Sequence, residues 1–124
     1  MGSIKIYDTT LRDGSQMRGI KYTVEDKIKI IKKLDKTGIH YIECGWPSSN
    51  PTDKEVFEKV KELKLENSII SAFGSTRHYN KKVEEDPNLN GLIESGAKAC
   101  SIFGKAWDLH VTEGFGIALE ENLK

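Results

Sequence analysis

The feature that most constrains the fold of this 124-residue chain is a strand-like run followed by a helix-like run, repeated about four times. The period is roughly 30 residues, which is the length of one βα unit. Two joints share one order of glycine, apolar strand and glycine, in GIHYIECG and GAKACSIFG. Near-continuous apolar strands that alternate with amphipathic helices predict a parallel sheet in the α/β class.

Local signals place the individual elements. The apolar runs predict strands at residues 4–7, 39–45, 69–74 and 97–104. Capping residues precede three helical patterns, which should therefore begin after Thr23, Asn50 and Asp86, and a fourth helix is expected from Thr112. The expected buried helix positions are Val24, Ile28, Ile31, Leu34, Val56, Phe57, Val60, Leu63, Leu89, Leu92, Ile93, Phe115, Leu119 and Leu123.

Two architectures fit this order of elements. One is a small open sheet of the flavodoxin type, a freestanding binding module with one closed core. The other is the first half of an eight-fold barrel, a fold that normally takes about 250 residues. The sequence stops inside a helical pattern, without a glycine, a proline or a tail, which favours a truncated piece.

Residues suited to chemistry gather where the strands end. Residues 8–16, 43–50, 74–78 and 104–110 are rich in polar, aromatic and glycine residues, whereas opposite joints such as DKTG and IESG are short and plain. Active sites of parallel α/β sheets lie beyond the carboxyl ends of the strands. We therefore expect a site at this end of the sheet.

Composition excludes several classes of partner. Basic and acidic residues number 19 each, so no overall field favours nucleic acid or an anionic membrane. No apolar run approaches the roughly 20 residues of a membrane span, and the N-terminus has no signal core, so a cytoplasmic location is expected. Cys44 and Cys100 lie in apolar runs without Cys-x-x-Cys spacing, which predicts reduced, buried thiols. Trp46 and Trp107 are expected to serve packing.

The segment YDTTLRDGSQ carries the most specific pattern. Arg12 is a fork-shaped cation, Asp13 is a hard oxygen ligand, and Gly14 permits a tight turn. These residue types alone fit a solvated loop as well as a site. Their order, DTTLRDG-x-Q, resembles the opening signature of the metal-dependent TIM-barrel acyltransferases and lyases named after an Asp-Arg-Glu set. Isopropylmalate, homocitrate and citramalate synthases belong to that family.

Later segments look most like the citramalate synthase branch: IECGWPSSNPTD, AFGSTR, EEDPNLNGLIESG and IFGKAWDLHVTE. The resemblance implies that residues 1–124 are the first four βα units of a (β/α)₈ TIM barrel, the N-terminal part of an HMGL-like (pyruvate carboxyltransferase) catalytic domain. It also implies condensation of acetyl-CoA with pyruvate to (R)-citramalate, on a route to isoleucine. The alternatives are a 2-isopropylmalate or homocitrate synthase, or an aldol-type lyase.

The resemblance assigns roles to four residues. Arg12 matches the catalytic arginine, which would stabilise the oxyanion formed from the keto group. Asp13 matches a ligand of the divalent metal (Mg, Mn or Zn), which would polarise that carbonyl. Glu43 matches the glutamate that orients the arginine, and Gln16 matches a loop glutamine near the acyl donor.

Weaker candidates lie in the later loops. Arg77 and Lys105 are placed to bind a carboxylate or the phosphates of CoA. His78 and His110 also lie in loops at the site end, where either could have a direct role or stay at the surface.

Two expectations follow from what residues 1–124 do not contain. The family completes its metal site with a His-x-His pair, and no H-x-H occurs here, so we expect no tight binding of Mn²⁺ or Mg²⁺ and no activity from these residues alone. A half barrel also leaves the first and last strands without an outer neighbour. Such edges recruit partners, which predicts a homo-oligomer.

Overall fold

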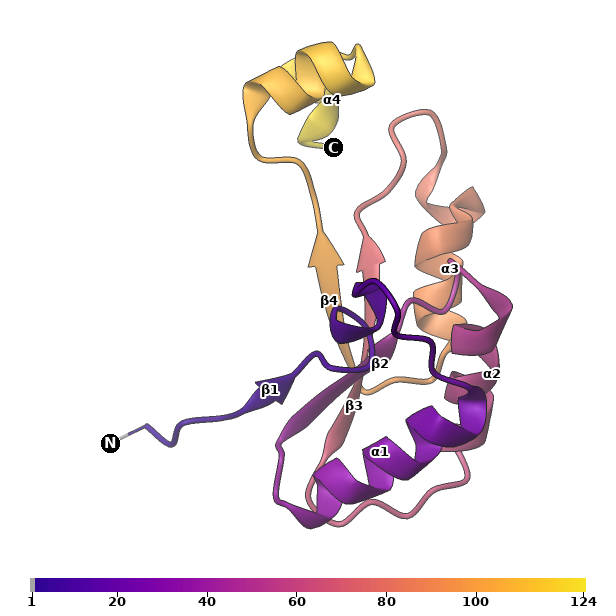
Figure 1. Cartoon of the computed structure of the whole chain (residues 1–124). Coiled ribbons are helices and arrows are strands. Elements are labelled where there is room, and N and C mark those ends of the chain that lie inside the picture. The colour runs from indigo at the N-terminus through magenta and orange to yellow at the C-terminus, as the bar shows by residue number, and fades with distance from the viewer. Residues whose placement is uncertain (1) are drawn as a thin grey trace.

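A computed structural model describes residues 2–124. Four strands form one parallel sheet in the order β1-β2-β3-β4, and helices follow the strands along the chain (Figure 1). The strands are β1 Tyr7–Asp8, β2 Tyr41–Gly45, β3 Ile69–Ser75 and β4 Ala99–Phe103. The helices are α1 Val24–Lys36, α2 Pro51–Val60, α3 Pro87–Glu94 and α4 Leu119–Asn122.

The sequential strand order decides between the two architectures. A flavodoxin-type sheet has the order 2-1-3-4-5 and carries helices on both faces. Here each strand pairs in parallel with the next one in the sequence, and α1, α2 and α3 lie on one side of the sheet (Figure 1). This is the arrangement of consecutive units in a TIM barrel, so the half-barrel prediction is confirmed and the flavodoxin-type alternative is wrong.

The predicted helix starts are confirmed by their caps. At α1 the side chain of Thr23 accepts from the backbone N–H of Asp26, and the Asp26 carboxylate accepts in return from the N–H of Thr23. Asn50 at α2 and Asp86 at α3 likewise accept from first-turn N–H groups, and a proline follows each of them. Free N–H groups at a helix start need such acceptors, and for this reason the helix starts could be predicted from the sequence.

The core lies between the sheet and the helices. The buried apolar side chains are Leu11, Val24, Ile31, Ile42, Cys44, Val56, Phe57, Val60, Ile70, Ala72 and Leu92. Because neighbouring residues of a strand point to opposite faces, Glu43, Ser71 and Phe73 lie on the other face of the sheet. We call this the inner face, since it would line the interior of a closed barrel.

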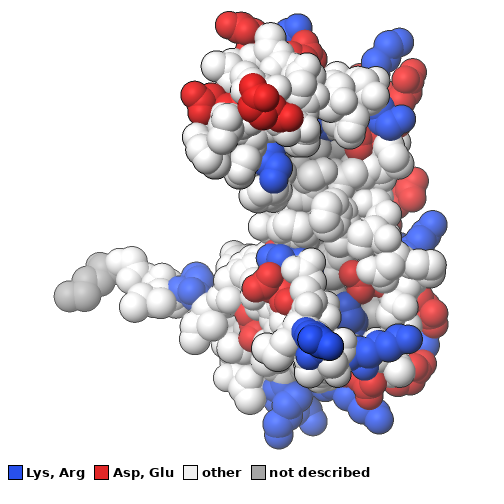
Figure 2. Space-filling view, turned by 45° about the horizontal axis from the view of Figure 1, so that its top comes forward, with Lys and Arg blue, Asp and Glu red and all other residues white. Residues whose placement is uncertain are grey.

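The predicted last helix is wrong in form. Residues His110–Phe115 make a π-helical turn, Gly116 takes a left-handed conformation with φ 67°, and α4 is a single short turn. A glycine at positive φ ends a helix, so the pattern from Thr112 could not continue. This segment lies beyond the end of β4, away from the sheet (Figure 1), and the upper part of the molecule in Figure 2 carries charges of both signs.

Several expected burials are also wrong, and most of them lie near β4. Cys100 is exposed, Ile93 is 78% exposed and Trp107 is 54% exposed. No helix in residues 2–124 packs on the outer face of β4, because the chain after it extends away from the sheet. The positions expected to be buried in the last helix, Phe115, Leu119 and Leu123, are exposed for the same reason.

The first strand is shorter than predicted. Ladder pairing covers only Tyr7 and Asp8, while Ile4 and Ile6 are exposed. A strand paired on one side only gains little from extending further.

No helix in the described part of the chain is both long and apolar enough to cross a membrane.

Candidate active site

The centre of the site is an ion pair between the β1 loop and β2. The Nε of Arg12 donates to Oε2 of Glu43 at 2.6 Å, and NH1 of Arg12 donates to Oδ1 of Asp13 at 3.1 Å. Glu43 is 1% exposed, whereas the side chain of Arg12 is 19% exposed and that of Asp13 is 65% exposed. The structure thus brings the three predicted site residues together, with Glu43 buried and Asp13 at the accessible rim.

Aromatic and hydroxyl groups of the inner face surround this pair. The guanidinium carbon of Arg12 lies 4.0 Å from the ring centroid of Phe73, a cation–π contact. The hydroxyl of Tyr7 donates to Oε1 of Glu43 at 2.9 Å and lies 2.7 Å from Oγ of Ser71. Both carboxylate oxygens of Glu43 thus have a donor, as a buried charge requires.

A buried lysine fixes the loops that carry the site. Nζ of Lys27 in α1 donates to the carbonyls of Leu11 and Cys44, at 2.8 and 3.2 Å, and to Oδ1 of Asp53 at 2.5 Å. The second oxygen of Asp53 accepts from the backbone N–H of Trp46. The ammonium uses all three of its donors, so one side chain ties the β1 loop, the end of β2 and the start of α2 together.

A glycine makes this junction possible. A Cβ built on Gly45 would lie 2.5 Å from the carboxyl carbon of Asp53, closer than any real contact allows. The backbone at residue 45 can therefore lie this close to the Asp53 carboxylate only because residue 45 is a glycine. The register of β2 against β3 also shifts between Glu43 and Gly45.

The metal expectation has only partial support. Asp13 offers an exposed carboxylate at the rim, the type of oxygen that a hard divalent ion takes. Within residues 2–124 no group of three or more His, Cys, Asp or Glu side chains could hold a metal ion. The donor set of these residues fits one ligand of such a site and does not complete it.

The later loop candidates lie along a different part of the rim. Arg77, His78 and Lys105 line a cavity of about 600 Å³ between the ends of β3 and β4 and the C-terminal segment, whereas His110 is not part of its wall. Gln16 is exposed in the turn after Asp13, outside this wall.

Arg77 is already engaged by the protein. Its NH2 donates to Glu121 at 3.2 Å, and its NH1 donates to the carbonyls of His78, Tyr79 and Lys81. Lys105 lies over the ring of Phe103 at 5.0 Å. His110 is exposed and meets Trp107 edge-on at 4.7 Å. The structure therefore joins Arg77 to the C-terminal segment and leaves Lys105 and His110 apart from Arg12 in the hydrogen-bond network.

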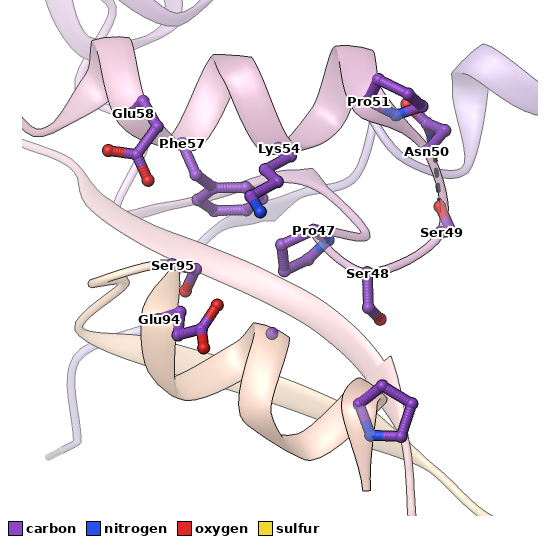
Figure 3. Close-up of a pocket in the computed structure, with 12 residues that line it drawn as sticks. Pro47, Ser48, Ser49, Asn50, Pro51, Lys54, Phe57, Glu58, Glu94 and Ser95 are labelled. Carbon is purple, nitrogen blue, oxygen red and sulfur yellow. Dashed lines mark hydrogen bonds between the residues drawn. The ribbon is translucent and has the colours of Figure 1, made fainter.

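A second hollow, of about 420 Å³, lies on the helical side between α2 and α3. Figure 3 shows Phe57 and Lys54 of α2 facing it, with Glu94 of α3 opposite and Pro47 at its edge. No buried side-chain polar atom among residues 2–124 lacks a hydrogen-bond partner, so the groove contains no buried, unpaired polar group. This groove is separate from the strand ends.

Sequence reasoning missed Tyr7, Ser71, Phe73, Lys27 and Asp53. Strand alternation could have found Ser71 and Phe73, because both share the parity of the inner face of β3. The expected buried positions of α1 are all apolar and do not include Lys27. A lysine on the buried side of a helix can be recognised only once its acceptors are known.

The fold and the site define the class. A parallel half barrel with an Arg–Glu pair and an adjoining aspartate at the carboxyl ends of its first two strands is the opening half of a TIM-barrel domain. The chain belongs to the HMGL-like family, whose model matches residues 3–124.

Several relatives can be compared directly. The chain is 56% identical to (R)-citramalate synthase of Aquifex aeolicus over 97% of its own length and 23% of the relative's. It is 53% identical to (R)-citramalate synthase of Geobacter sulfurreducens, over 100% of this chain and 24% of the relative. It is 46% identical to 2-isopropylmalate synthase of Shouchella clausii, over 90% of this chain and 21% of the relative. The chain spans about a quarter of the length of these curated relatives.

A solved structure shares the fold. The crystal structure of a Bacillus subtilis HMG-CoA lyase matches 97% of this chain and 39% of that chain, with a TM-score of 0.67 and 23% identity. At this identity the match supports the TIM-barrel assignment alone.

Proposed function

We propose that residues 1–124 form the N-terminal part of the catalytic domain of a metal-dependent acyltransferase that condenses acetyl-CoA with pyruvate to give (R)-citramalate. The observation that carries the proposal is the buried Arg12–Glu43 pair at the strand ends, in a chain 56% identical to an (R)-citramalate synthase. We also propose a cytoplasmic location, and the equal numbers of basic and acidic residues, 19 each, give no overall attraction to an anionic membrane.

The reaction needs a cation where negative charge develops. Transfer of a proton from the acetyl methyl group to a base gives a carbanion, which attacks the keto carbon of pyruvate. A carbon–carbon bond forms, and the electrons of the C=O bond move to oxygen as an alkoxide. Protonation of that oxygen and hydrolysis of the thioester by water then give citramalate and free CoA. Arg12 offers its NH2, which has no hydrogen-bond partner within residues 2–124, to that oxygen. Glu43 and Phe73 keep the guanidinium in place, so little reorganisation is needed during the reaction.

Asp13 would contribute one ligand to a divalent ion, and that ion would supply Lewis-acid polarisation of the same carbonyl. Gln16 would lie near the acyl donor. Among the cations of the later loops, Lys105 is the better candidate for a CoA phosphate, because Arg77 is already paired with Glu121. His110 stays a candidate at the rim of the C-terminal segment.

The chain by itself should be inactive and should associate with copies of itself. It supplies one metal ligand and only four of eight strands, so the reaction chamber is open. Exposed apolar side chains lie at both edges of the sheet, with Ile102 and Phe103 in β4 and with Ile4 and Ile6 just before β1. Unpaired edges of this kind favour a homo-oligomer.

A chimera tests the function. Residues 1–124 would replace the matching segment of the Aquifex aeolicus (R)-citramalate synthase, and the product from acetyl-CoA and pyruvate would be identified by chiral chromatography. We expect (R)-citramalate. Arg12→Lys should lower kcat about 10²-fold, because a lysine cannot reproduce the fixed fork. Arg18→Lys, an exposed arginine in the same loop, should have no effect.

The alternative function has its own outcome in the same experiment. The 46% identity to a 2-isopropylmalate synthase favours that enzyme as the second candidate. A chimera that prefers a branched 2-oxo acid over pyruvate would support it. A folded chimera that forms no condensation product, or an Arg12→Lys variant with full activity, would contradict the proposed function.

A further inference from the structure

We infer that Tyr7 is a positioning residue: its hydroxyl fixes the carboxylate of Glu43, and through that carboxylate it sets the direction of the Arg12 guanidinium. The inference rests on the proposed function of Arg12 for its catalytic consequence. Its structural content depends only on the contacts among these side chains.

Counting donors gives the hydrogen-bond chain a direction. A tyrosine hydroxyl carries one proton, and at Tyr7 this proton goes to Oε1 of Glu43. The contact at 2.7 Å between Tyr7 and Ser71 must then be donated by the serine. The chain therefore runs from Ser71 through Tyr7 to Glu43, where it meets the donor Nε of Arg12 from the opposite side.

The burial of Glu43 makes this contact decisive. The residue is 1% exposed, so water does not replace a lost donor at Oε1. Without the Tyr7 hydroxyl the carboxylate would turn toward solvent to regain a partner, and its other oxygen would leave the Nε of Arg12. The guanidinium would then be held only by the ring of Phe73 and by the exposed Asp13.

The environment keeps the Tyr7 hydroxyl a donor. Partial burial, together with the adjacent Glu43 carboxylate, raises the pKa of Tyr7 above its ordinary value of 10.0. The phenol therefore remains protonated at neutral and mildly alkaline pH. The hydroxyl is what matters here, because the ring of Tyr7 is at the edge of the sheet and packs mainly on Tyr41, with centroids 5.9 Å apart.

The test uses the chain as it is. Nuclear magnetic resonance would measure solvent exchange of the Arg12 Nε proton, assigned through Arg12→Lys, in the parent protein, in Tyr7→Phe and in Tyr41→Phe. Tyr41→Phe is the matched control, because it removes a hydroxyl from the stacked ring and leaves the contact to Glu43. We expect Tyr7→Phe to speed exchange about tenfold, the effect of one lost hydrogen bond to a charge, and Tyr41→Phe to change nothing.

A general loss of stability must be told apart from a local effect. Exchange of backbone amides in β2 and β3, measured in the same samples, should be unchanged in Tyr7→Phe. Unaltered exchange of the Arg12 proton in a folded Tyr7→Phe variant would overturn the inference. So would equal acceleration of the backbone amides, since that would mean a role in stability alone. Ser71→Ala, which removes the far donor, should give a smaller acceleration of the same sign.

The catalytic consequence is measured separately in the chimera. Tyr7→Phe should lower kcat and leave the KM for acetyl-CoA unchanged, because it misdirects Arg12 without touching the acyl donor. If the parent chimera makes no product, the proposed function fails while the exchange result stands. If the parent is active and kcat is unchanged in Tyr7→Phe, the inference fails while the function stands.

Discussion

Two buried carboxylates hold loops at opposite ends of the sheet. Asp35, at the end of α1, accepts from the backbone N–H groups of Glu66, Asn67 and Ser68. Asp86 does the same for His78 and for the first turn of α3. Burial by itself would raise the pKa of each carboxyl, but the N–H groups stabilise the charged form and the net pKa is lowered.

The lowered pKa values of these two carboxyl groups predict that the fold loses stability in acid. Because the folded pKa of Asp35 lies below the ordinary 3.8, its contribution to stability is fully present above that value and is lost as pH falls through the folded pKa. The free energy of unfolding of the parent protein, measured by urea titrations at several acid pH values, should therefore fall as the pH is lowered. It should fall less steeply in Asp35→Asn, whereas Glu62→Gln on the exposed surface should follow the parent. Identical slopes for Asp35→Asn and the parent would contradict this account.

Residues of the site differed in how far the sequence could predict them. Arg12, Asp13 and Glu43 were identified through the family signature, because their spacing in the chain says nothing of a contact across 31 positions. The sequence predicts Tyr7 only as part of a strand and gives it no role in the site. With a ladder of two residues in β1, no alternation was available to show that its hydroxyl faces Glu43.

The elements follow from the sequence where local chemistry decides them. The starts of α1, α2 and α3 were predicted because each has an acceptor side chain for its free N–H groups. The prediction of a last helix from Thr112 was wrong, because its apolar spacing suggested a core contact that the chain does not make. A helical pattern with no surface to pack against is not stable by propensity alone.

The junction around Lys27 yields a prediction for α1 and the loops that it joins. Lys27→Met keeps the length of the side chain but leaves the carboxylate of Asp53 without its cation, and it frees the carbonyl of Leu11. Breaking a buried pair from one side should cost about 3 kcal/mol of unfolding free energy, measured by urea denaturation. Lys29→Met, on the exposed side of the same helix, is the control. Equal stability of the two variants would show that the buried pair contributes little.

The whole molecule is an open sheet with two unlike edges. All strands of a TIM barrel run in the same direction, so closing a barrel from two copies would pair the β4 edge of one copy with the β1 edge of the other. Two such contacts related by a two-fold axis would close a ring of eight strands and bring both Arg12 side chains to one end. The repeat predicted a parallel sheet but left its strand order open between two architectures, and the family resemblance implied the sequential order of a barrel. The partner of the edge strands is not encoded in any local pattern.

Association can be measured directly. Size-exclusion chromatography with light scattering should show a mass that rises with concentration toward a dimer. Ile102→Lys, a charge at the β4 edge, should shift the equilibrium toward the monomer. Ile93→Lys is the matched control, because Ile93 is also an exposed isoleucine but lies on α3. A concentration-independent monomer in the parent would contradict the prediction, as would an equal effect of the two substitutions.

The aromatic contact beside Arg12 has an optical consequence. Trp46 meets Phe73 edge-on at 5.2 Å, and Phe73 in turn carries the guanidinium of Arg12 on its face. An anion drawn to that guanidinium would change the field at the indole, so the emission of Trp46 follows occupancy of the strand ends without an added label. Replacing Trp107 would leave Trp46 as the single tryptophan, and Trp46 is separated from the guanidinium of Arg12 by the ring of Phe73 alone.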